Sequence, residues 1–292
     1  MALTLATYNV LDLFDSADQR KIEALGAMVR ELAADVIAFQ EVGSLAALKA
    51  VLAAAGGGFG DPIVGRADKR GIACALVSKR PILDVRMLDA PSLPFPTFHE
   101  GDPEPFGDRI LLRRAVPIVR IDGGDLGPLN VLSLHWKSGR PSSIVLRDGT
   151  ERQPVTVAER AEGDLRSLVQ RAAEALFLRR AIDELIQSRP REGISVCGDF
   201  NDVSGSVPLQ VICGGGEGSL HDVVERIPAA VRISVLHGGS PAAIDHVLLT
   251  HALAGRVQSA RFLNEQLADP DALPEGEQVL PSDHAPLVVV FA

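Results

Sequence analysis

Hydrophobic and polar residues follow two different periods in the first 60 positions of the chain. Residues 3–9 alternate and are rich in strand formers, and residues 36–40 form a short apolar run typical of a buried strand. Between them, apolar residues recur at helical spacing, at Ile22, Leu25, Met28, Val29 and Leu32. Ser16 followed by Gln19 fits a capping box, so Ser16 is predicted to cap this helix. A second helix is predicted over 45–55, and glycines follow it.

The rest of the chain combines strands with long loops and one long helical stretch. Turn residues separate strand-like segments in the middle, at 71–78, 110–121 and 129–136. Residues 91–108 hold five prolines and residues 138–157 are polar, so both segments are predicted to be loops. Apolar residues return to a helical period over 159–188, which predicts one long helix or two joined by a kink. Further strands are predicted over 194–197, 243–249 and 287–291.

The organisation of these segments favours a single domain over residues 1–292. The sequence has no internal repeat, no low-complexity segment and no stretch that resembles a linker. Strands cluster in both halves, with helices between and outside them. This order is typical of an α/β fold.

The charge balance limits which partners the chain can bind. Lys and Arg number 29 and Asp and Glu number 38, so the net charge is −9. An acidic chain does not attract a polyanion such as nucleic acid through its overall field. Residues 137–180 differ, with nine basic and six acidic residues, which fits either a solvated helix face or a local phosphate-binding rim. Aromatic residues make up only 4%, which disfavours a broad stacking platform for single strands.

Cysteine content and the N-terminal residues indicate a compartment. Three cysteines are too few for a disulfide framework or a thiolate zinc site, so reduced, mostly buried thiols are expected. The first residues lack the features of a signal peptide. No apolar run reaches the roughly 18 residues that a membrane span needs. We therefore expect a soluble, cytoplasmic protein without membrane contact, and no feature indicates an obligate protein partner.

Polar residues able to carry out chemistry stand at or near the ends of the apolar strands. In α/β sheets such positions are where functional sites are assembled. The set comprises Asn9, Glu41, His135, Asp199, Asn201, Asp245, Asp283 and His284. Each residue alone has an ordinary structural interpretation, such as a solvated turn for Glu41. Only the whole set indicates a site.

The positions of Asp199, Asn201 and Asp245 predict where their side chains point and what they bond. Asp199 and Asn201 point the same way in an extended segment, although an Asx-turn would also explain them. Asp245 lies inside an apolar strand, where an unpaired charge is costly, so a histidine N–H is a natural partner. His246 alternates to the opposite face and is predicted to be structural.

Together these residues amount to a hard-cation site with two histidines. Oxygen ligands without thiolates favour Mg²⁺ or Mn²⁺ over zinc. Such a cation commonly serves phosphate chemistry, because it neutralises charge on phosphoryl oxygens.

The chain resembles the endonuclease/exonuclease/phosphatase family of deoxyribonuclease I-like enzymes. The resemblance spans the full length and rests on six short motifs in the family's order: Thr7-Tyr8-Asn9, Phe39-Gln40-Glu41, His135 with Lys137-Ser138, Gly198-Asp199-Phe200-Asn201, Ile244-Asp245-His246 and Ser282-Asp283-His284. It implies a four-layered α/β sandwich, in which two packed mixed β-sheets are flanked by helices. It also implies Mg²⁺-dependent hydrolysis of a phosphoester by water, with Mn²⁺ able to substitute.

The resemblance further implies roles for individual residues. Glu41 is the main metal ligand, assisted by Asn9 and Asp283. Asp199 orients or deprotonates the attacking water, and Asn201 holds a phosphoryl oxygen.

The remaining roles concern histidines and cations. His284 pairs with Asp245, and His135 contacts the phosphate. The family's substrate arginine, on the strand before the histidine strand, matches Arg113 or Arg114, of which we prefer Arg114, and Lys137 is a second substrate-binding residue.

The substrate stays open at this point. Nucleic acid, a phosphorylated small molecule and a lipid headgroup are all substrates of a phosphoesterase, and the lack of a lipid-binding amphipathic segment makes the lipid least favoured. The alternative outside enzymology is a non-catalytic module that binds a phosphate ligand on the same fold. The complete polar set argues against that module.

Overall fold

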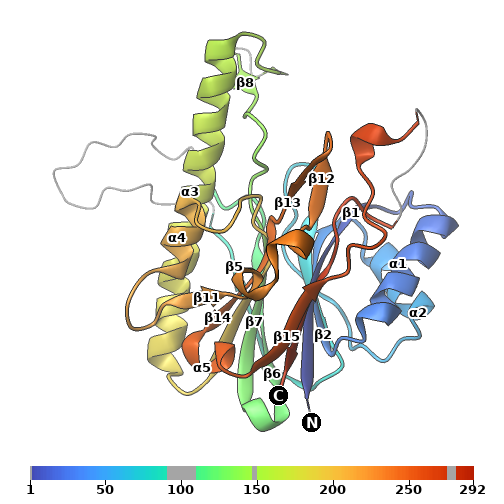
Figure 1. Ribbon diagram of the computed structural model, residues 1–292, viewed down its shortest axis with the longest axis vertical. Helices are drawn as coiled ribbons and strands as arrows, with labels where there is room; N and C mark the ends of the chain where they lie inside the picture. The colour runs from blue at the N-terminus through green and yellow to red at the C-terminus, as the bar shows by residue number, and fades with distance from the viewer. Residues whose placement is uncertain (1, 91–109, 147–149, 275–280) are drawn as a thin grey trace.

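Two six-stranded mixed sheets pack face to face, and helices cover the outer face of each (Figure 1). The computed structural model describes residues 2–90, 110–146, 150–274 and 281–292. This is the four-layered α/β sandwich that the resemblance implies.

The two sheets draw their strands from both halves of the chain. The first sheet has the order β15-β16-β1-β2-β4-β3, with β1 Leu3–Leu13, β2 Val36–Val42, β3 Ile63–Val64, β4 Ala73–Ser78, β15 Val257–Phe262 and β16 Leu287–Phe291. The second sheet has the order β11-β14-β10-β7-β6-β5, with β5 Ile82–Leu88, β6 Val116–Asp122, β7 Pro128–His135, β10 Gly193–Asp199, β11 Leu220–Asp222 and β14 Asp245–Thr250.

Two short hairpins lie outside these sheets, and helices connect the strands. The hairpins are β8 Ile144–Val145 with β9 Glu151–Arg152, and β12 Val235–His237 with β13 Ser240–Ala242. The α-helices of the described residues are α1 Gln19–Leu32, α2 Leu45–Ala54, α3 Val157–Ser188, α4 Val207–Cys213 and α5 His251–Ala254.

Each sheet is built around one parallel pair of strands. β1 runs parallel to β2 in the first sheet, and β7 runs parallel to β10 in the second. The carboxyl ends of the two parallel pairs lie close together. The side-chain amide of Asn9, on β1, lies 3.1 Å from a carboxylate oxygen of Asp199, at the end of β10. This shared edge lies toward the top of Figure 1, away from the chain's N-terminus.

Aliphatic side chains fill the spaces between the layers. Val36 and Val131 lie in the core between the sheets. On the outer face of the first sheet, α1 and α2 pack through Leu25 and Leu48. On the outer face of the second sheet, Leu178 of α3 packs with residues of α4. The three cysteines are unpaired, as the sequence predicts.

The cap of α1 differs from the prediction. Asp18, not Ser16, is the N-cap, and its carboxylate accepts a hydrogen bond from the backbone N–H of Lys21 at 2.8 Å. The helix begins at Gln19, so a cap at Ser16 would be two residues too early. Asp is as good an N-cap as Ser, and the position next to the first helical residue decides between them. Gln19 bonds Glu23 on the next turn instead.

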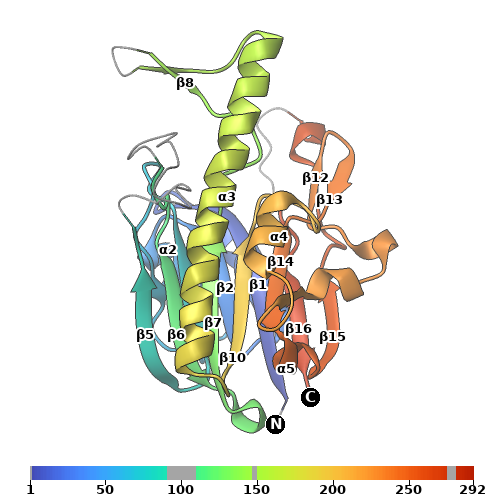
Figure 2. The ribbon, with the colours of Figure 1, turned by 90° about the vertical axis from the view of Figure 1, so that its left-hand side faces the viewer.

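The long helical stretch is a single helix that projects beyond the body of the protein. α3 has 32 residues, which gives it a length of about 48 Å. Thr156 and Glu159 form a capping box at its start. Its buried apolar residues all lie from Ala173 onward, and the N-terminal half with the β8–β9 hairpin extends past the sheets (Figures 1 and 2).

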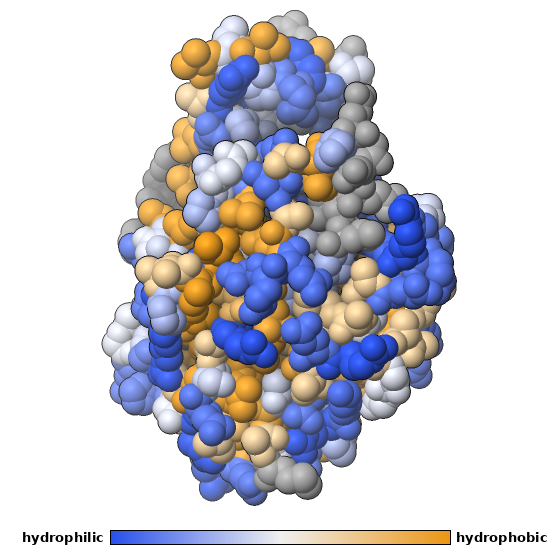
Figure 3. All heavy atoms as spheres, turned by 45° about the vertical axis from the view of Figure 1, so that its right-hand side comes forward, coloured by the Kyte–Doolittle hydropathy of each residue, from blue (hydrophilic) through white to orange (hydrophobic). Residues whose placement is uncertain are grey.

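The projecting end exposes part of the apolar stripe that predicted the helix. Leu165, Val157, Val155 and Val145 are all exposed there. Figure 3 shows apolar residues interspersed with hydrophilic ones at this end of the molecule. The packing of α3 on the sheet therefore depends on its C-terminal half.

Several other boundaries differ from the prediction. The strand predicted over 110–121 begins only at Val116, and residues 110–115 lead into it without pairing. The segment 138–157, predicted as loop, contains the β8–β9 hairpin. The predicted loop 91–108 lies outside the described residues. None of the described helices combines the length and apolar composition needed to cross a membrane.

Candidate active site

A pocket of about 470 Å³ opens where the carboxyl ends of the central strands meet. Seven of the ten predicted site residues line it: Glu41, Arg114, His135, Asp199, Asn201, Asp283 and His284. The other three, Asn9, Lys137 and Asp245, are not among the residues that line it. The structure thus brings residues from positions 41 to 284 together in one cavity.

Unusual backbone conformations cluster at this pocket. Leu11, Asp12, Glu41 and Asn201 have positive φ angles of 50°, 46°, 62° and 51°, and all four line the pocket. A left-handed conformation at a non-glycine residue costs on the order of 1–3 kcal/mol and is retained where the surroundings impose it. The strands β1 and β2 also change register here. These irregularities turn the ends of both strands toward the cavity.

Only one of the two carboxylate oxygens of Glu41 accepts a hydrogen bond from a described residue. The Asp12 backbone N–H donates to Oε2 of Glu41 at 2.9 Å, while Oε1 lies 3.9 Å from Nε2 of His135. Burial, and then the charge of Asp12, raise the pKa of Glu41. A buried carboxylate with one oxygen free to bind is suited to a cation.

Asp283 faces the same cavity. Its Oδ1 atom is buried and has no hydrogen-bond partner among the described residues. Ser282 fixes the segment, because its hydroxyl donates to the backbone oxygen of Asn9 at 2.7 Å and accepts from the His284 N–H at 3.2 Å. An orphaned carboxylate oxygen in the same pocket as Glu41 fits the oxygen ligation that Mg²⁺ or Mn²⁺ prefers.

Asn9 stands behind the pocket rather than in its wall. Its amide donates to Oδ2 of Asp199, and its oxygen accepts from the Leu11 N–H at 3.0 Å. In this arrangement Asn9 links the two sheets and fixes the irregular end of β1.

His284 is bonded to Asp245, on the neighbouring strand β14. Nδ1 of His284 lies 2.8 Å from Oδ2 of Asp245, and Nε2 lies 3.8 Å from Oδ2 of Asp199. Burial lowers the pKa of His284, but the charges of Asp245 and Asp199 outweigh it and raise that pKa to about 10. The ring is therefore an imidazolium that turns one N–H toward the cavity.

Asp199 is the centre of the polar cluster. Oδ2 receives the Asn9 amide and lies 3.4 Å from Nε2 of His135. Burial raises the pKa of Asp199, and the charge of His284 opposes this. Ligand atoms of Asp199, Asp245 and His284 lie within 4.8 Å of one another. Because Nδ1 of His284 is already bonded to Asp245, we interpret this trio as a group that holds charge and protons rather than a metal.

His135 is neutral in this surrounding. Burial, and then the nearby Arg114, lower its pKa well below the ordinary value. Its Nδ1 atom is buried without a partner among the residues that the structure describes.

The segment after Asp199 forms the Asx-turn and not an extended strand, because β10 ends at Asp199 and Asn201 has a φ of 51°. The backbone N–H of Asn201 donates to Oδ1 of Asp199 at 2.8 Å, which is an Asx-turn, and its side chain also lines the pocket. The side-chain amide donates to the Trp136 carbonyl at 3.2 Å. Gly198 allows the ends of β10 and β7 to lie close together, since a Cβ at this position would lie 2.0 Å from the Leu134 carbonyl oxygen.

The two predicted substrate cations are placed differently. Arg114 lines the pocket, pairs with Asp68 at 2.8 Å and donates to the His135 carbonyl at 2.9 Å. Lys137 does not line the pocket, and its ammonium group donates to the backbone oxygens of Ser138 and Arg140. Burial and neighbouring arginines lower the pKa of Lys137 to about 8. Lys137 thus shapes the loop after β7 in this structure.

Two arginines and a histidine at the pocket were not identified from the sequence: Arg70, Arg140 and His237. They come from loops and from a short hairpin, where no periodic pattern marks them. The nine-to-six basic excess over 137–180, which includes Arg140, was the only signal.

Comparisons with known proteins identify the family of the chain and its fold. The model of the Endonuclease/Exonuclease/phosphatase family matches residues 6–284, and no curated protein matches the chain. A truncated TDP2 from Caenorhabditis elegans superposes with a TM-score of 0.64 at 15% identity, covering 99% of this chain and 97% of that one. A mannosyl-6-phosphatase from Bacteroides thetaiotaomicron gives 0.62 at 18% identity, with 98% of each chain covered.

A third similar structure is an endonuclease/exonuclease/phosphatase from Beutenbergia cavernae, with a TM-score of 0.60 and 18% identity over 99% of this chain and 71% of that one. At such identities the superpositions establish the fold alone. The match of the family model over nearly the whole length goes further, and with it the chain belongs to the endonuclease/exonuclease/phosphatase family.

Proposed function

We propose that this protein is a metal-dependent phosphoesterase that hydrolyses its substrate by attack of water. One observation carries the proposal. Two carboxylates, Glu41 in β2 and Asp283 in the segment before β16, face the same pocket as Asp199, Asn201 and His284. A pure binding module for a phosphate anion has no need of so many buried carboxylates, because they repel it.

The donor set fits a divalent cation. Glu41 and Asp283 would hold it, each with a carboxylate oxygen that accepts no hydrogen bond from a described residue. When bound there, the cation supplies positive charge that offsets the charge of the phosphoryl oxygens. No thiol lines this pocket, so hard cations such as Mg²⁺ and Mn²⁺ are preferred.

The side chains of the pocket then orient the attacking water and bind the phosphate. Asp199 accepts a hydrogen bond from the attacking water and orients it, and burial raises the pKa of Asp199 so that it can also take the proton. The His284 imidazolium donates its Nε2 proton in a hydrogen bond to a phosphoryl oxygen, where charge develops as the ester bond breaks. Asn201 holds a second phosphoryl oxygen, and neutral His135 contacts the phosphate from the β7 side.

The substrate is best sought among small phosphoesters and short nucleic acids. The net charge of −9 disfavours a long duplex except at local cations that line the pocket, such as Arg70 and Arg140. One similar structure is a mannosyl-6-phosphatase, so sugar phosphates belong in the search.

A substrate panel tests the proposal. The purified protein is assayed on plasmid, single-stranded DNA, RNA, cyclic dinucleotides, a sugar 6-phosphate and a bis-aryl phosphodiester, each with Mg²⁺, Mn²⁺ or EDTA. We expect hydrolysis of at least one substrate with a metal and none with EDTA. Hydrolysis of none of them under any condition would favour the binding module.

A further inference from the structure

Two adjacent residues of β14 point to opposite sides of the second sheet and make similar pairs. Asp245 bonds His284 at the active site, while His246 faces the other way and bonds Asp222 at 2.8 Å. His246 is completely buried and does not touch the pocket of the active site. The mechanism above leaves it without a role.

Both ring nitrogens of His246 are used. Nε2 lies 2.9 Å from the backbone carbonyl oxygen of Asp202, and Nδ1 bonds Oδ2 of Asp222. A carbonyl only accepts, so Nε2 carries a proton. Asp222 already accepts from the Ser204 hydroxyl and the Val224 N–H, as an ionised carboxylate does. Nδ1 therefore donates as well, and the ring is a buried imidazolium.

The pKa directions agree with this protonation. Burial lowers the pKa of His246, but the charge and hydrogen bond of Asp222 outweigh it and raise the pKa above 6.5. The same charge of His246 lowers the pKa of Asp222 against the effect of burial.

The ring contacts both neighbours of Asn201. On one side, the Phe200 ring packs edge-to-face on it, with centroids 5.3 Å apart and planes at 80°. On the other side lies the Asp202 carbonyl, and Arg171 holds the Asp202 carboxylate at 2.9 Å. Asn201 between them has a φ of 51°, a conformation that its surroundings must maintain.

We propose that His246 is a positioning residue, which as an imidazolium bonded to Asp222 holds the turn of Phe200 and Asp202 so that the Asn201 amide faces the active site. The inference rests on the proposed function for its catalytic consequence only. Its structural part, that the ring maintains the Asn201 conformation, stands without it.

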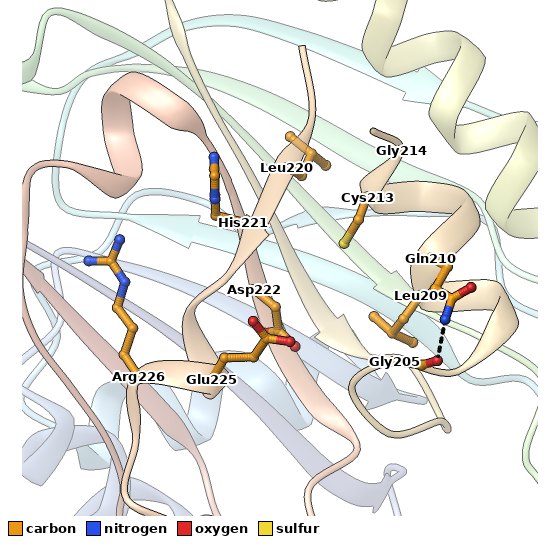
Figure 4. Close-up of a pocket in the computed structure, with 10 residues that line it drawn as sticks. All are labelled: Gly205, Leu209, Gln210, Cys213, Gly214, Leu220, His221, Asp222, Glu225 and Arg226. Carbon is orange, nitrogen blue, oxygen red and sulfur yellow. Dashed lines mark hydrogen bonds between the residues drawn. The ribbon is translucent and has the colours of Figure 1, made fainter. Parts of the chain in front are cut away.

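A second pocket, shown in Figure 4, provides a matched control. Asp222 and Glu225 lie on the same side of this cavity of about 560 Å³, opposite Cys213 and Gln210 of α4. The Glu225 carboxylate makes no hydrogen bond or ion pair with another described residue. Removal of either carboxylate changes the same pocket, but only Asp222 bonds His246.

Four variants test the proposal. His246→Asn keeps a donor near the position of Nδ1 and loses the bond to the Asp202 carbonyl, whereas His246→Gln keeps a donor near the position of Nε2. Asp222→Ala removes the counter-charge, and Glu225→Ala is the control. Hydrogen exchange of the Asn201 backbone amide is measured for each, together with kcat and KM on whichever substrate the wild type hydrolyses.

We expect exchange of the Asn201 amide to accelerate in His246→Asn and Asp222→Ala and to stay at the wild-type rate in Glu225→Ala. In His246→Asn and Asp222→Ala, kcat should fall by roughly 10- to 100-fold with KM nearly unchanged, as for other residues that orient a reacting group. His246→Gln should retain more of both properties than His246→Asn.

A folded His246→Asn with unchanged exchange at Asn201 would overturn the proposal, as would equal effects of the Asn and Gln variants. Should His246→Asn fail to fold, the comparison of Asp222→Ala with Glu225→Ala decides in the same way. If the wild type hydrolyses nothing, the proposed function fails, and the exchange measurement still decides whether His246 holds the turn.

Discussion

Nδ1 of His284 lies 2.8 Å from Oδ2 of Asp245, although 39 residues separate them in the chain. Both side chains are buried, and the other nitrogen of the ring faces Asp199 and the pocket. A carboxylate bonded to one nitrogen of an imidazole fixes the ring's orientation and stabilises its charged form. This pair is the main source of positive charge that the chain itself places inside the acidic cluster.

Loss of the His284 ring should therefore act on turnover. We expect His284→Ala to lower kcat by roughly a hundredfold or more and leave KM nearly unchanged, because a donor to the developing charge of the transition state is removed. Steady-state kinetics on the best substrate of the panel measures both constants. A variant with unchanged kcat would show that the ring takes no part.

The pair should also behave as one unit. Asp245→Asn is expected to lower kcat too, because it keeps the shape and removes the charge that supports the imidazolium. The double variant should then be little worse than His284→Ala alone. Fully additive losses would mean that the two residues act separately.

Arg114 should be important for stability as well as for the site. It forms a buried ion pair with Asp68, with side chains 6% and 7% exposed. Arg114→Ala leaves a buried carboxylate unpaired, which is expected to cost about 3 kcal/mol of unfolding free energy. Denaturant unfolding measures it, with Arg152→Ala as the control, since the Arg152–Glu159 pair is more exposed and its loss should cost much less. Equal losses in both variants would contradict the assignment.

The His246–Asp222 pair predicts how stability depends on pH. The pKa of His246 is raised on folding, so its contribution is complete below pH 6.5 and is lost as the pH rises through the folded value. The pKa of Asp222 is lowered, so its contribution is present above pH 3.8 and is lost on acidification. Asp222→Ala should therefore reduce the unfolding free energy more at pH 6 than at pH 9. The same reduction at both pH values would count against a charged pair.

Arg140 should bind substrate rather than speed the reaction. Its backbone is fixed by the side chains of Lys137, Ser138 and Ser167, while its guanidinium at the pocket has no partner among the described residues. Arg140→Ala is expected to raise KM by about tenfold with kcat unchanged, the cost of one charged hydrogen bond. Arg160→Ala, an exposed arginine outside the pocket, is the control. A fall in kcat alone would refute this role.

The sequence predicts the central strands and the helices well because their burial imposes a period. β2 and β10 are buried at nearly every position, and α1 buries residues at the predicted helical spacing. Strands at the edge of a sheet are harder to predict in this way. β5 is largely exposed although most of its residues are apolar, so burial does not impose on it a period that would mark it as a strand.

Some residues of the candidate site could likewise be predicted from the sequence, and others could not. Residues at the ends of buried strands, such as Glu41 and Asp199, could be found from their position in the chain. Arg140 and His237 could not, because a loop packed on α3 and a short hairpin bring them to the pocket. The Cβ of an alanine at Gly163 would lie 2.9 Å from Pro141, and this close packing of the loop on α3 has no sequence period.

The central claim is that Glu41 holds a divalent cation that hydrolysis requires. The most direct test is the initial rate of phosphoester hydrolysis as a function of Mg²⁺ concentration, for the wild type, Glu41→Gln and the control Glu225→Gln. Glu41→Gln removes one ligand charge with little change of shape, so its half-saturating Mg²⁺ concentration should rise by about tenfold or more, while the control follows the wild type. A wild-type rate that persists in EDTA, or a Glu41→Gln curve that coincides with the wild-type curve, would contradict the account.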